Sequence, residues 1–256
     1  MRHIFIGDVH GMLNELNTLL DTLNLQPDDH IVFVGDLLDK GPDSPGVVKR
    51  VRQLSTEHSH VTLVSGNHED THQRYRGHLQ KNPKTANEMA QRKPELLDIT
   101  SELSSDDIAF LNAAKWFHRV PKHNILVVHG GITKDMPSFP NTEAEVESWS
   151  SKERKRFKLI LRTRHVHATK GSFVGLGDEK PNDPFWADVY DGRFGHVIFG
   201  HQPFLEGVKF FPHATGIDTG AVFGGTLTAL VYESSNPQNP IVVNVPCPAF
   251  AEMHYD

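Results

Sequence analysis

Short apolar runs that end in a cluster of glycine and polar residues recur five times along this chain, and they limit its possible folds more than any other feature. Each run has three or four residues, as in a strand that is buried on both faces. Side chains that can bind metals follow at once, in the segments GDVHG, GDLLDKGP, SGNHE, HGG and GHQ after residues 4–6, 31–34, 61–64, 125–128 and 197–199. The chain therefore presents polar groups at the ends of several buried strands.

Helical patterns lie between these runs. Leucines between residues 13 and 23 recur at spacings of three and four, which indicates an amphipathic helix. Ser44 and Pro45 are a good N-cap and first-turn pair for a second helix, with apolar residues up to Leu54. Strand, loop, helix and strand in this order predict an α/β fold.

Two polar stretches interrupt this order, at about residues 70–118 and 134–192. We expect them to be mainly helical insertions over one face of a single domain that spans residues 1–256. From residue 214 to residue 245 the pattern becomes one of strands and turns, which predicts a second sheet packed on the first.

Composition excludes several classes of protein. A formal charge of −6 over 256 residues disfavours a long nucleic-acid partner. The single cysteine, Cys247, excludes an internal disulfide framework and fits a reducing compartment. No stretch approaches the ~18 apolar residues of a membrane span, and the start of the chain turns polar too soon for a signal peptide. We therefore expect a cytoplasmic protein, in which 17 histidines are a first hint of metal chemistry.

The polar groups at the strand ends form a ligand set for metals. In open α/β sheets, ligands gather at the carboxyl ends of the strands. Any one of these residues alone is more often a turn residue or a surface histidine, but five strand ends with the same property are unlikely to be accidental. The residues concerned are Asp8, His10, Asp36, Asn67, His129 and His201.

Carboxylate, amide and imidazole ligands without a thiolate suit Mn, Fe or Zn. Six such ligands with one shared carboxylate are about right for two ions, and we predict that Asp36, in the middle of the set, bridges them. Asn67 then supplies a neutral oxygen to one metal. His68 is expected to point toward the leaving group of a phosphorylated substrate.

Five motifs in this order, GDVHG, GDLLDKGPDS, GNHE, VHGG and GHQ, resemble the signature of the calcineurin-like metallophosphoesterases, and more narrowly of the phosphoprotein-phosphatase superfamily. The resemblance spans residues 4 to about 230. It implies a four-layer α/β-β/α sandwich of two mixed sheets, with a two-metal site at the carboxyl ends of the strands and the six ligands named above. It also implies that His68 is the general acid and that Asp39 orients it.

Other residues resemble one branch of this superfamily. Protein phosphatases usually have arginine where this chain has Lys40, and lysine cannot form the same bidentate contact with phosphate. The segments GDLLDKGP and GIDTGAVFGGTLTAL resemble ApaH-like enzymes, the symmetrical diadenosine tetraphosphatases. Departures from that branch are HGGI in place of HAGI and the presence of Asp39.

The favoured function is hydrolysis of dinucleoside polyphosphates or other small phosphoanhydrides, which include inorganic polyphosphate and capped RNA ends. Candidate ligands for the substrate phosphates are Lys40, Arg162 and Arg164, although LRTRH can equally be a solvated helix face. The alternative is a phosphatase of phosphoserine and phosphothreonine in proteins. A third hypothesis, from a different class, is a metal-binding scaffold without catalysis.

Overall fold

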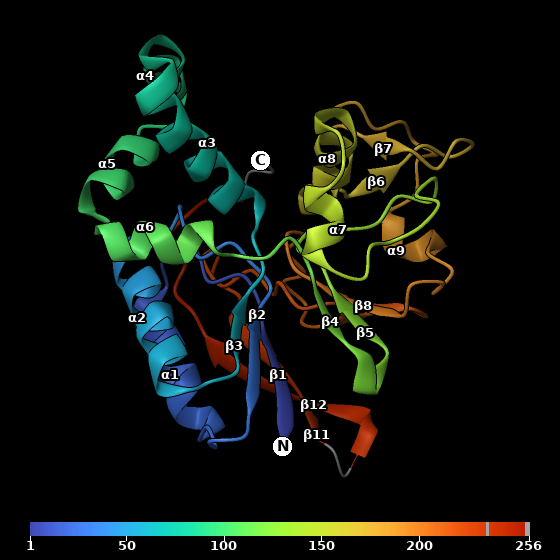
Figure 1. Ribbon diagram of the computed structural model, residues 1–256. Coiled ribbons are helices and arrows are strands. Elements are labelled where there is room, and N and C mark those ends of the chain that lie inside the picture. The colour runs from blue at the N-terminus through green and yellow to red at the C-terminus, as the bar shows by residue number, and fades with distance from the viewer. Residues whose placement is uncertain (234–235, 254–256) are drawn as a thin grey trace.

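Two five-stranded sheets pack against each other in the computed structural model, which describes residues 1–233 and 236–253 (Figure 1). The first sheet has the order β12-β11-β1-β2-β3, and the second has the order β4-β5-β8-β10-β9. The strands of the first sheet are β1 (Arg2–Ile6), β2 (His30–Phe33), β3 (Val61–Leu63), β11 (Thr226–Glu233) and β12 (Asn236–Pro246). Those of the second are β4 (His118–Val120), β5 (Ile125–Val127), β8 (His196–Phe199), β9 (Lys209–Phe210) and β10 (Ala214–Gly216).

The prediction that residues 214–245 form the second sheet is wrong. β11 pairs antiparallel with β1 and therefore extends the first sheet, and β12 pairs with β11. Only β10 belongs to the second sheet, where it lies parallel to β8. An apolar pattern reveals a strand but not its neighbour, because pairing partners far apart in the chain depend on the tertiary fold.

Alternation along the strands produces four layers. In β1, Ile4 and Ile6 pack into a core with the helices α1 (Leu13–Leu23) and α2 (Ser44–Glu57), while Phe5 lies in the core between the sheets. In the second sheet, Val197 packs in an outer core around Trp186, while Ile198 lies in the core between the sheets. The mixed α/β fold with two mixed sheets flanked by helices is therefore confirmed.

The two polar stretches differ in content. The first contains helices throughout, α3 (Asn67–Lys81), α4 (Pro83–Arg92), α5 (Glu95–Glu102) and α6 (Ser105–Asn112). The second contains α7 (Glu143–Glu147), α8 (Ser151–Phe157), the 3-10 turn η2 (Lys158–Leu161), the hairpin of β6 (His165–Val166) and β7 (Phe173–Val174), and α9 (Trp186–Val189). A further 3-10 turn, η1 (Pro121–His123), joins β4 to β5. No helix among the described residues is both long and apolar enough to cross a membrane.

Helix α2 begins one residue earlier than its sequence predicts. Asp43 is the N-cap, and its side chain accepts a hydrogen bond from the amide of Gly46 at 2.7 Å. Ser44, predicted as the cap, instead accepts a hydrogen bond from the amide of Asp39 at 2.9 Å. The start of α2 therefore supports the loop that follows β2.

Candidate metal centre

The loops at the carboxyl ends of the strands have an unusual backbone. Five non-glycine residues there have φ angles between 44° and 70°, in the left-handed region that side chains other than glycine seldom adopt. Such conformations persist only where the surroundings impose them, and they gather at functional sites. The five residues are His10, Asp36, Asp39, Lys40 and His201.

A buried carboxylate holds these loops in place. Glu69 accepts hydrogen bonds from the amides of Asp36 at 2.8 Å, Leu37 at 2.9 Å and Gly66 at 2.8 Å. The amide of His10 donates to the carbonyl of Asp36 at 2.9 Å, so the loops after β1 and β2 are also joined to each other. Glu69 was not among the site residues predicted from the sequence. Its position three residues after Gly66, which caps α3, was the available signal.

The side chains of these loops converge on the carboxylate of Asp36. His129 Nε2 lies 3.1 Å from Asp36 Oδ2 and 3.1 Å from Asn67 Oδ1. His10 Nε2 lies 3.7 Å and His68 Nε2 lies 3.9 Å from the same oxygen of Asp36. Two groups that could hold a metal share this residue, namely His10 with Asp36 and His68, and Asp36 with His129 and His201. We call these five residues the metal cluster.

Backbone carbonyls orient two imidazoles of the metal cluster, those of His10 and His129. His10 Nδ1 donates to the carbonyl of Leu38 at 2.7 Å, and His129 Nδ1 donates to that of Val34 at 2.9 Å. Each ring therefore turns Nε2 toward Asp36 as an acceptor, which is the form that binds metals. Burial lowers the pKa of His10 to about 3 and that of His201 well below its usual value, so both rings are neutral.

The donor set fits divalent cations. Asp8 accepts a hydrogen bond from the amide of His201 at 2.9 Å through Oδ2. Its Oδ1 and the Nε2 of His201 are buried and have no hydrogen-bond partner among the described residues. Burial and the neighbouring carboxylates of Asp218 and Asp36 raise the pKa of Asp8 well above its usual value. Buried carboxylates and unpaired imidazole nitrogens are the groups that a bound cation would satisfy.

Comparison with protein families agrees with this geometry. The family described as calcineurin-like phosphoesterase matches residues 1–204, which is most of the chain. The chain belongs to this family. It is therefore a metal-dependent phosphohydrolase, and the family uses a site for two metal ions.

Individual relatives of this phosphoesterase support the same assignment. A curated relative from Bacillus thuringiensis, named as an asymmetrical bis(5'-nucleosyl)-tetraphosphatase, is 28% identical over 91% of both chains. A crystal structure of a provisionally assigned diadenosine tetraphosphatase is 25% identical, with a TM-score of 0.70 over 96% of this chain and 93% of the other. A cold-active protein-tyrosine phosphatase from Shewanella, 18% identical with a TM-score of 0.61 over 96% of this chain and 80% of the other, shows the shared fold alone.

In this phosphoesterase, one carboxylate joins His68 of the metal cluster to a second histidine outside the cluster. His68 Nδ1 lies 2.5 Å from Asp39 Oδ2, and His72 Nε2 lies 2.7 Å from Asp39 Oδ1. Burial alone would raise the pKa of Asp39, but the hydrogen bonds from the two histidines outweigh it and hold this pKa well below its usual range. Asp39 is therefore ionised and keeps a proton on the facing nitrogen of each ring. His72 was not found from the sequence, although its spacing of four residues from His68 in α3 places both on one helix face.

The three basic residues proposed from the sequence lie in different surroundings. Lys40 and Arg164 line the small cavity at the metal cluster. Arg164 is buried and donates to the carbonyl of His201 at 3.1 Å. Arg162 does not line that cavity, because it donates to Asp70 at 3.1 Å and to the carbonyl of Asn67 at 3.3 Å. In this arrangement Arg162 supports the start of α3.

Asp218 also lines the cavity at the metal cluster and was not among the residues predicted from the sequence. It follows β10, which runs parallel to β8, so its position obeys the same strand-end rule as the other acidic residues. The run before it is short and contains a threonine and a glycine, so it was not recognised as an apolar strand. Burial raises the pKa of Asp218 to about 6.

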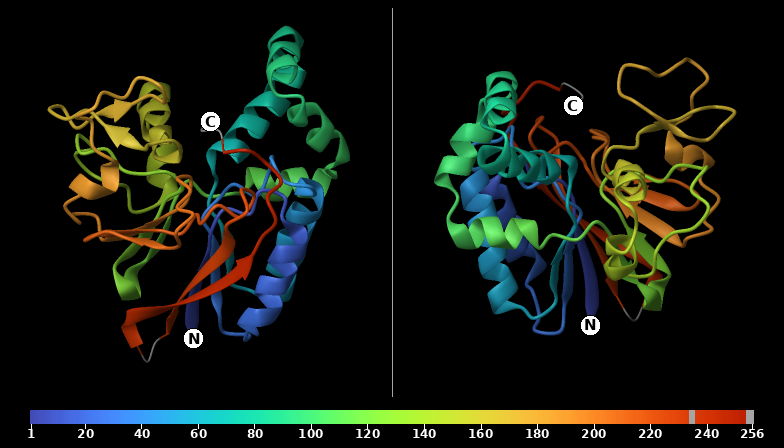
Figure 2. Two further views of the ribbon diagram at one scale, coloured as in Figure 1. Left: turned by 180° about the vertical axis from the view of Figure 1, so that it is seen from behind. Right: turned by 45° about the horizontal axis from the view of Figure 1, so that its top comes forward.

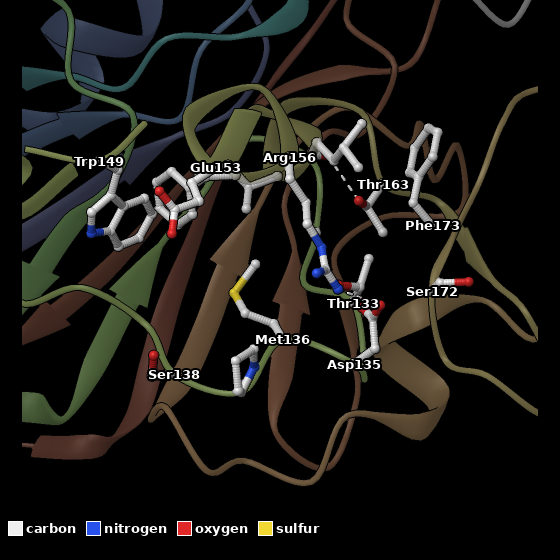
Figure 3. A pocket seen from close by; sticks show the side chains of 15 residues that line it. Thr133, Asp135, Met136, Ser138, Trp149, Glu153, Arg156, Thr163, Ser172 and Phe173 are labelled. Carbon is white, nitrogen blue, oxygen red and sulfur yellow. Dashed lines mark hydrogen bonds and ion pairs between the residues drawn. The ribbon is translucent and has the colours of Figure 1, made fainter. Parts of the chain in front are cut away.

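A larger cavity of about 580 Å³ lies between the loop after β5, α8, η2 and β7, and no residue of the metal cluster lines it (Figure 3). Figure 3 shows Trp149 on one side of this cavity and Phe173 on the other, with Met136 and Arg156 between them. Ile160 in its wall accepts hydrogen bonds from the amides of Gly130 and Gly131, at 2.8 and 3.0 Å. These glycines directly follow His129. The η2 turn therefore links the wall of this cavity to the loop that carries His129, although the cavity does not open onto the metal cluster.

Proposed function

We propose that this phosphoesterase uses two divalent cations to hydrolyse dinucleoside polyphosphates or other small phosphoanhydrides. The observation that carries the proposal is the pair of metal-binding groups that share Asp36, next to the hydrogen-bonded pair of Asp39 and His68. The substrate class is supported by the bis(5'-nucleosyl)-tetraphosphatases, which match 91% of the chain. A small anionic substrate also agrees with the absence of a basic footprint in a chain of net charge −6.

Six residues are proposed as ligands of the two ions, with Asp36 as the bridge. Their oxygen and imidazole donors suit Mn, Fe or Zn, and Mn is our first choice. When bound, such a pair polarises the phosphoryl oxygens and activates water near neutral pH. The ligands are Asp8, His10, Asp36, Asn67, His129 and His201.

His68 is proposed as the general acid. Ionised Asp39 accepts a hydrogen bond from the protonated Nδ1 of His68, which fixes the ring and favours a proton on Nε2 as well. As the oxygen of water bonds to phosphorus, the bond from phosphorus to the leaving oxygen breaks, and that oxygen takes the Nε2 proton. The attacking water releases one proton to solvent and His68 regains one from solvent, so that one water is consumed for each bond cleaved.

Lys40 and Arg164 are proposed to bind the phosphates of the substrate, because both line the cavity at the metal cluster. A guanidinium can form two parallel hydrogen bonds to phosphate, whereas an ammonium acts as a point charge. A role for Arg162 in phosphate binding stays a prediction, and it would require this side chain to leave Asp70.

The experiment that tests this function compares diadenosine tetraphosphate with a phosphoserine peptide under one Mn²⁺ condition. We expect clear preference for the dinucleotide. The products also locate the cleaved bond, because two ADP indicate symmetrical cleavage, and ATP with AMP indicates asymmetrical cleavage. The sequence resembles symmetrical enzymes, whereas the curated relative is named as asymmetrical. Preference for the peptide would instead favour a protein phosphatase, and no turnover of either would favour a scaffold. The cytoplasmic location stays a prediction.

A further inference from the structure

A groove of about 510 Å³ opens beside His68, on the side of the first polar stretch of the chain. Asp39, Lys40 and His68 line its inner side. Its outer walls are residues 92–95, at the junction of α4 and α5, and residues 251–252 near the end of the chain.

The groove adjoins the position at which His68 would meet a leaving group. His68 lines both the groove and the cavity at the metal cluster, so an oxygen that takes its proton lies at their junction. The cavity at the metal cluster has only about 10 Å³ of free space. That is room for roughly one water molecule. Most of a substrate whose phosphoryl group reaches the metal cluster therefore lies outside this cavity, and the adjoining groove has the volume of a small-molecule site.

The charges of the groove match a nucleotide. Lys40, Arg92 and Lys93 supply cations, which bind phosphate oxygens. Glu95 and Glu252 supply carboxylates, which accept hydrogen bonds from ribose hydroxyls. The side chain of Arg92 is exposed and makes no hydrogen bond or ion pair with the described residues. A nucleotide presents both phosphates and hydroxyls, whereas the departing serine of a protein presents neither a phosphate nor a ribose.

The outer wall is held in a defined position relative to His68. Tyr75 from α3, Ala86 from α4 and Leu96 from α5 form a buried apolar cluster that joins the three helices. His68 is the second residue of α3, and residues 92–95 link α4 to α5, so the same cluster positions both (Figure 1). The two views of Figure 2 also show α3, α4 and α5 as one group.

We propose that residues 92–95 form a subsite for the leaving nucleotide, in which Arg92 and Lys93 contact its phosphates and Glu95 contacts its ribose hydroxyls. This inference rests on the proposed function, since it takes a dinucleoside polyphosphate as the substrate. It makes the junction of α4 and α5 the part of the chain that selects a nucleotide over a phosphopeptide.

The first test is Arg92→Ala, with diadenosine tetraphosphate and p-nitrophenyl phosphate as substrates. We expect kcat/KM for the dinucleotide to fall about tenfold, because a charge-assisted hydrogen bond is lost. Turnover of p-nitrophenyl phosphate, whose leaving group has no phosphate, should not change. The matched control is Lys84→Ala, which removes an exposed cation from the same helix outside the groove and should affect neither substrate. Equal losses on both substrates, or no loss on the dinucleotide, would overturn the subsite.

The second test is Glu95→Ala, with diadenosine tetraphosphate and inorganic tripolyphosphate as substrates. We expect kcat/KM for the dinucleotide to fall about fivefold, as for the loss of one hydrogen bond. Tripolyphosphate has no ribose, so its turnover should stay the same. A loss of the same size on both substrates would remove Glu95 from the subsite.

Inhibition by ADP separates failure of the subsite from failure of the proposed function. ADP should inhibit hydrolysis of p-nitrophenyl phosphate by the unsubstituted enzyme, and Arg92→Ala should raise its inhibition constant about tenfold. If the unsubstituted enzyme does not hydrolyse diadenosine tetraphosphate, the proposed function fails, but this comparison still decides the subsite. An inhibition constant that is the same in both proteins would overturn it.

Discussion

Histidines gather at both ends of the sheets, and the two groups differ in their surroundings. At the carboxyl ends, the histidines of the metal cluster converge on Asp36. At the opposite ends lie His3, His30, His60 and His123, which we call the far cluster. Here His3 Nδ1 lies 3.2 Å from His123 Nε2, and the rings of His30 and His60 stack with centroids 4.2 Å apart. Within the described residues, both groups that could hold a metal lie at the carboxyl ends.

The difference shows that position on the strand, rather than residue type, creates the site. In the far cluster the imidazoles contact one another, and one ring nitrogen pairs with another. In the metal cluster, carbonyls hold the rings with Nε2 inward, and His201 Nε2 has no partner among the described residues. A high histidine content was therefore a weak indication of metal chemistry, whereas the strand-end pattern was a strong one.

The largest effect is expected for Asp36→Asn, because Asp36 belongs to both metal-binding groups. A bound metal pair supplies several kcal/mol to the transition state, so activity should fall about a thousandfold or more. Metal content, measured by elemental analysis, should fall with it. The matched control is His3→Asn in the far cluster, which should retain metal and activity. Loss of metal from the control would contradict the inference that the far cluster takes no part in metal binding.

A smaller effect is expected for His68→Asn, which removes the proposed acid and leaves the ligands in place. General acid catalysis contributes about a hundredfold or more, so turnover of p-nitrophenyl phosphate should fall by that factor. Metal content should not change. Undiminished turnover would remove His68 from the mechanism. His68 would then contribute no more to catalysis than a histidine of the far cluster.

His72→Asn should have a weaker effect, since His72 acts on the acid only through Asp39. Loss of such an outer partner typically costs about tenfold in activity. We expect the high-pH limb of the pH–rate profile, where the general acid loses its proton, to shift while KM stays constant, because Asp39 loses one of its two hydrogen bonds. A uniform loss at every pH would instead indicate a purely structural role.

The far cluster should affect stability rather than catalysis. Burial, with smaller contributions from His123, His30, Lys122 and His118, lowers the pKa of His3 to about 4. The unfolded chain, with an ordinary histidine pKa, binds this proton more tightly. The contribution of neutral His3 to the free energy of unfolding is therefore fully present above about pH 6.5, and it is lost as the pH falls toward 4.

His3→Gln should reduce this acid sensitivity. Between pH 7 and pH 5, the loss of unfolding free energy should be about 1–2 kcal/mol smaller than in the unsubstituted protein. Urea unfolding at the two pH values measures it. The same loss in both proteins would mean that His3 does not titrate as its surroundings imply.

Much of the fold and part of the site were predictable from the sequence. Residues at strand ends can be recognised from the local sequence, because a buried apolar run must be followed by a turn. Their proximity can also be predicted, because the carboxyl ends of parallel strands lie at the same edge of a sheet. Asp36 and His129 were recognisable in this way. The prediction that His68 is the general acid and is oriented by Asp39 depended on a resemblance between motifs, and the structure shows that these two side chains meet where the loop after β2 approaches α3.

The apolar pattern by itself determined that this chain builds buried strands with metal-type ligands at their ends, since burial and chain reversal act within a few residues. Only the tertiary structure decided that β11 and β12 extend the first sheet, that Glu69 holds the loops, and that Asp218 joins the cavity. It also brought residues 92–95 to the side of His68. These features depend on contacts between segments far apart in the chain, and no local pattern specifies which distant segment a residue will meet.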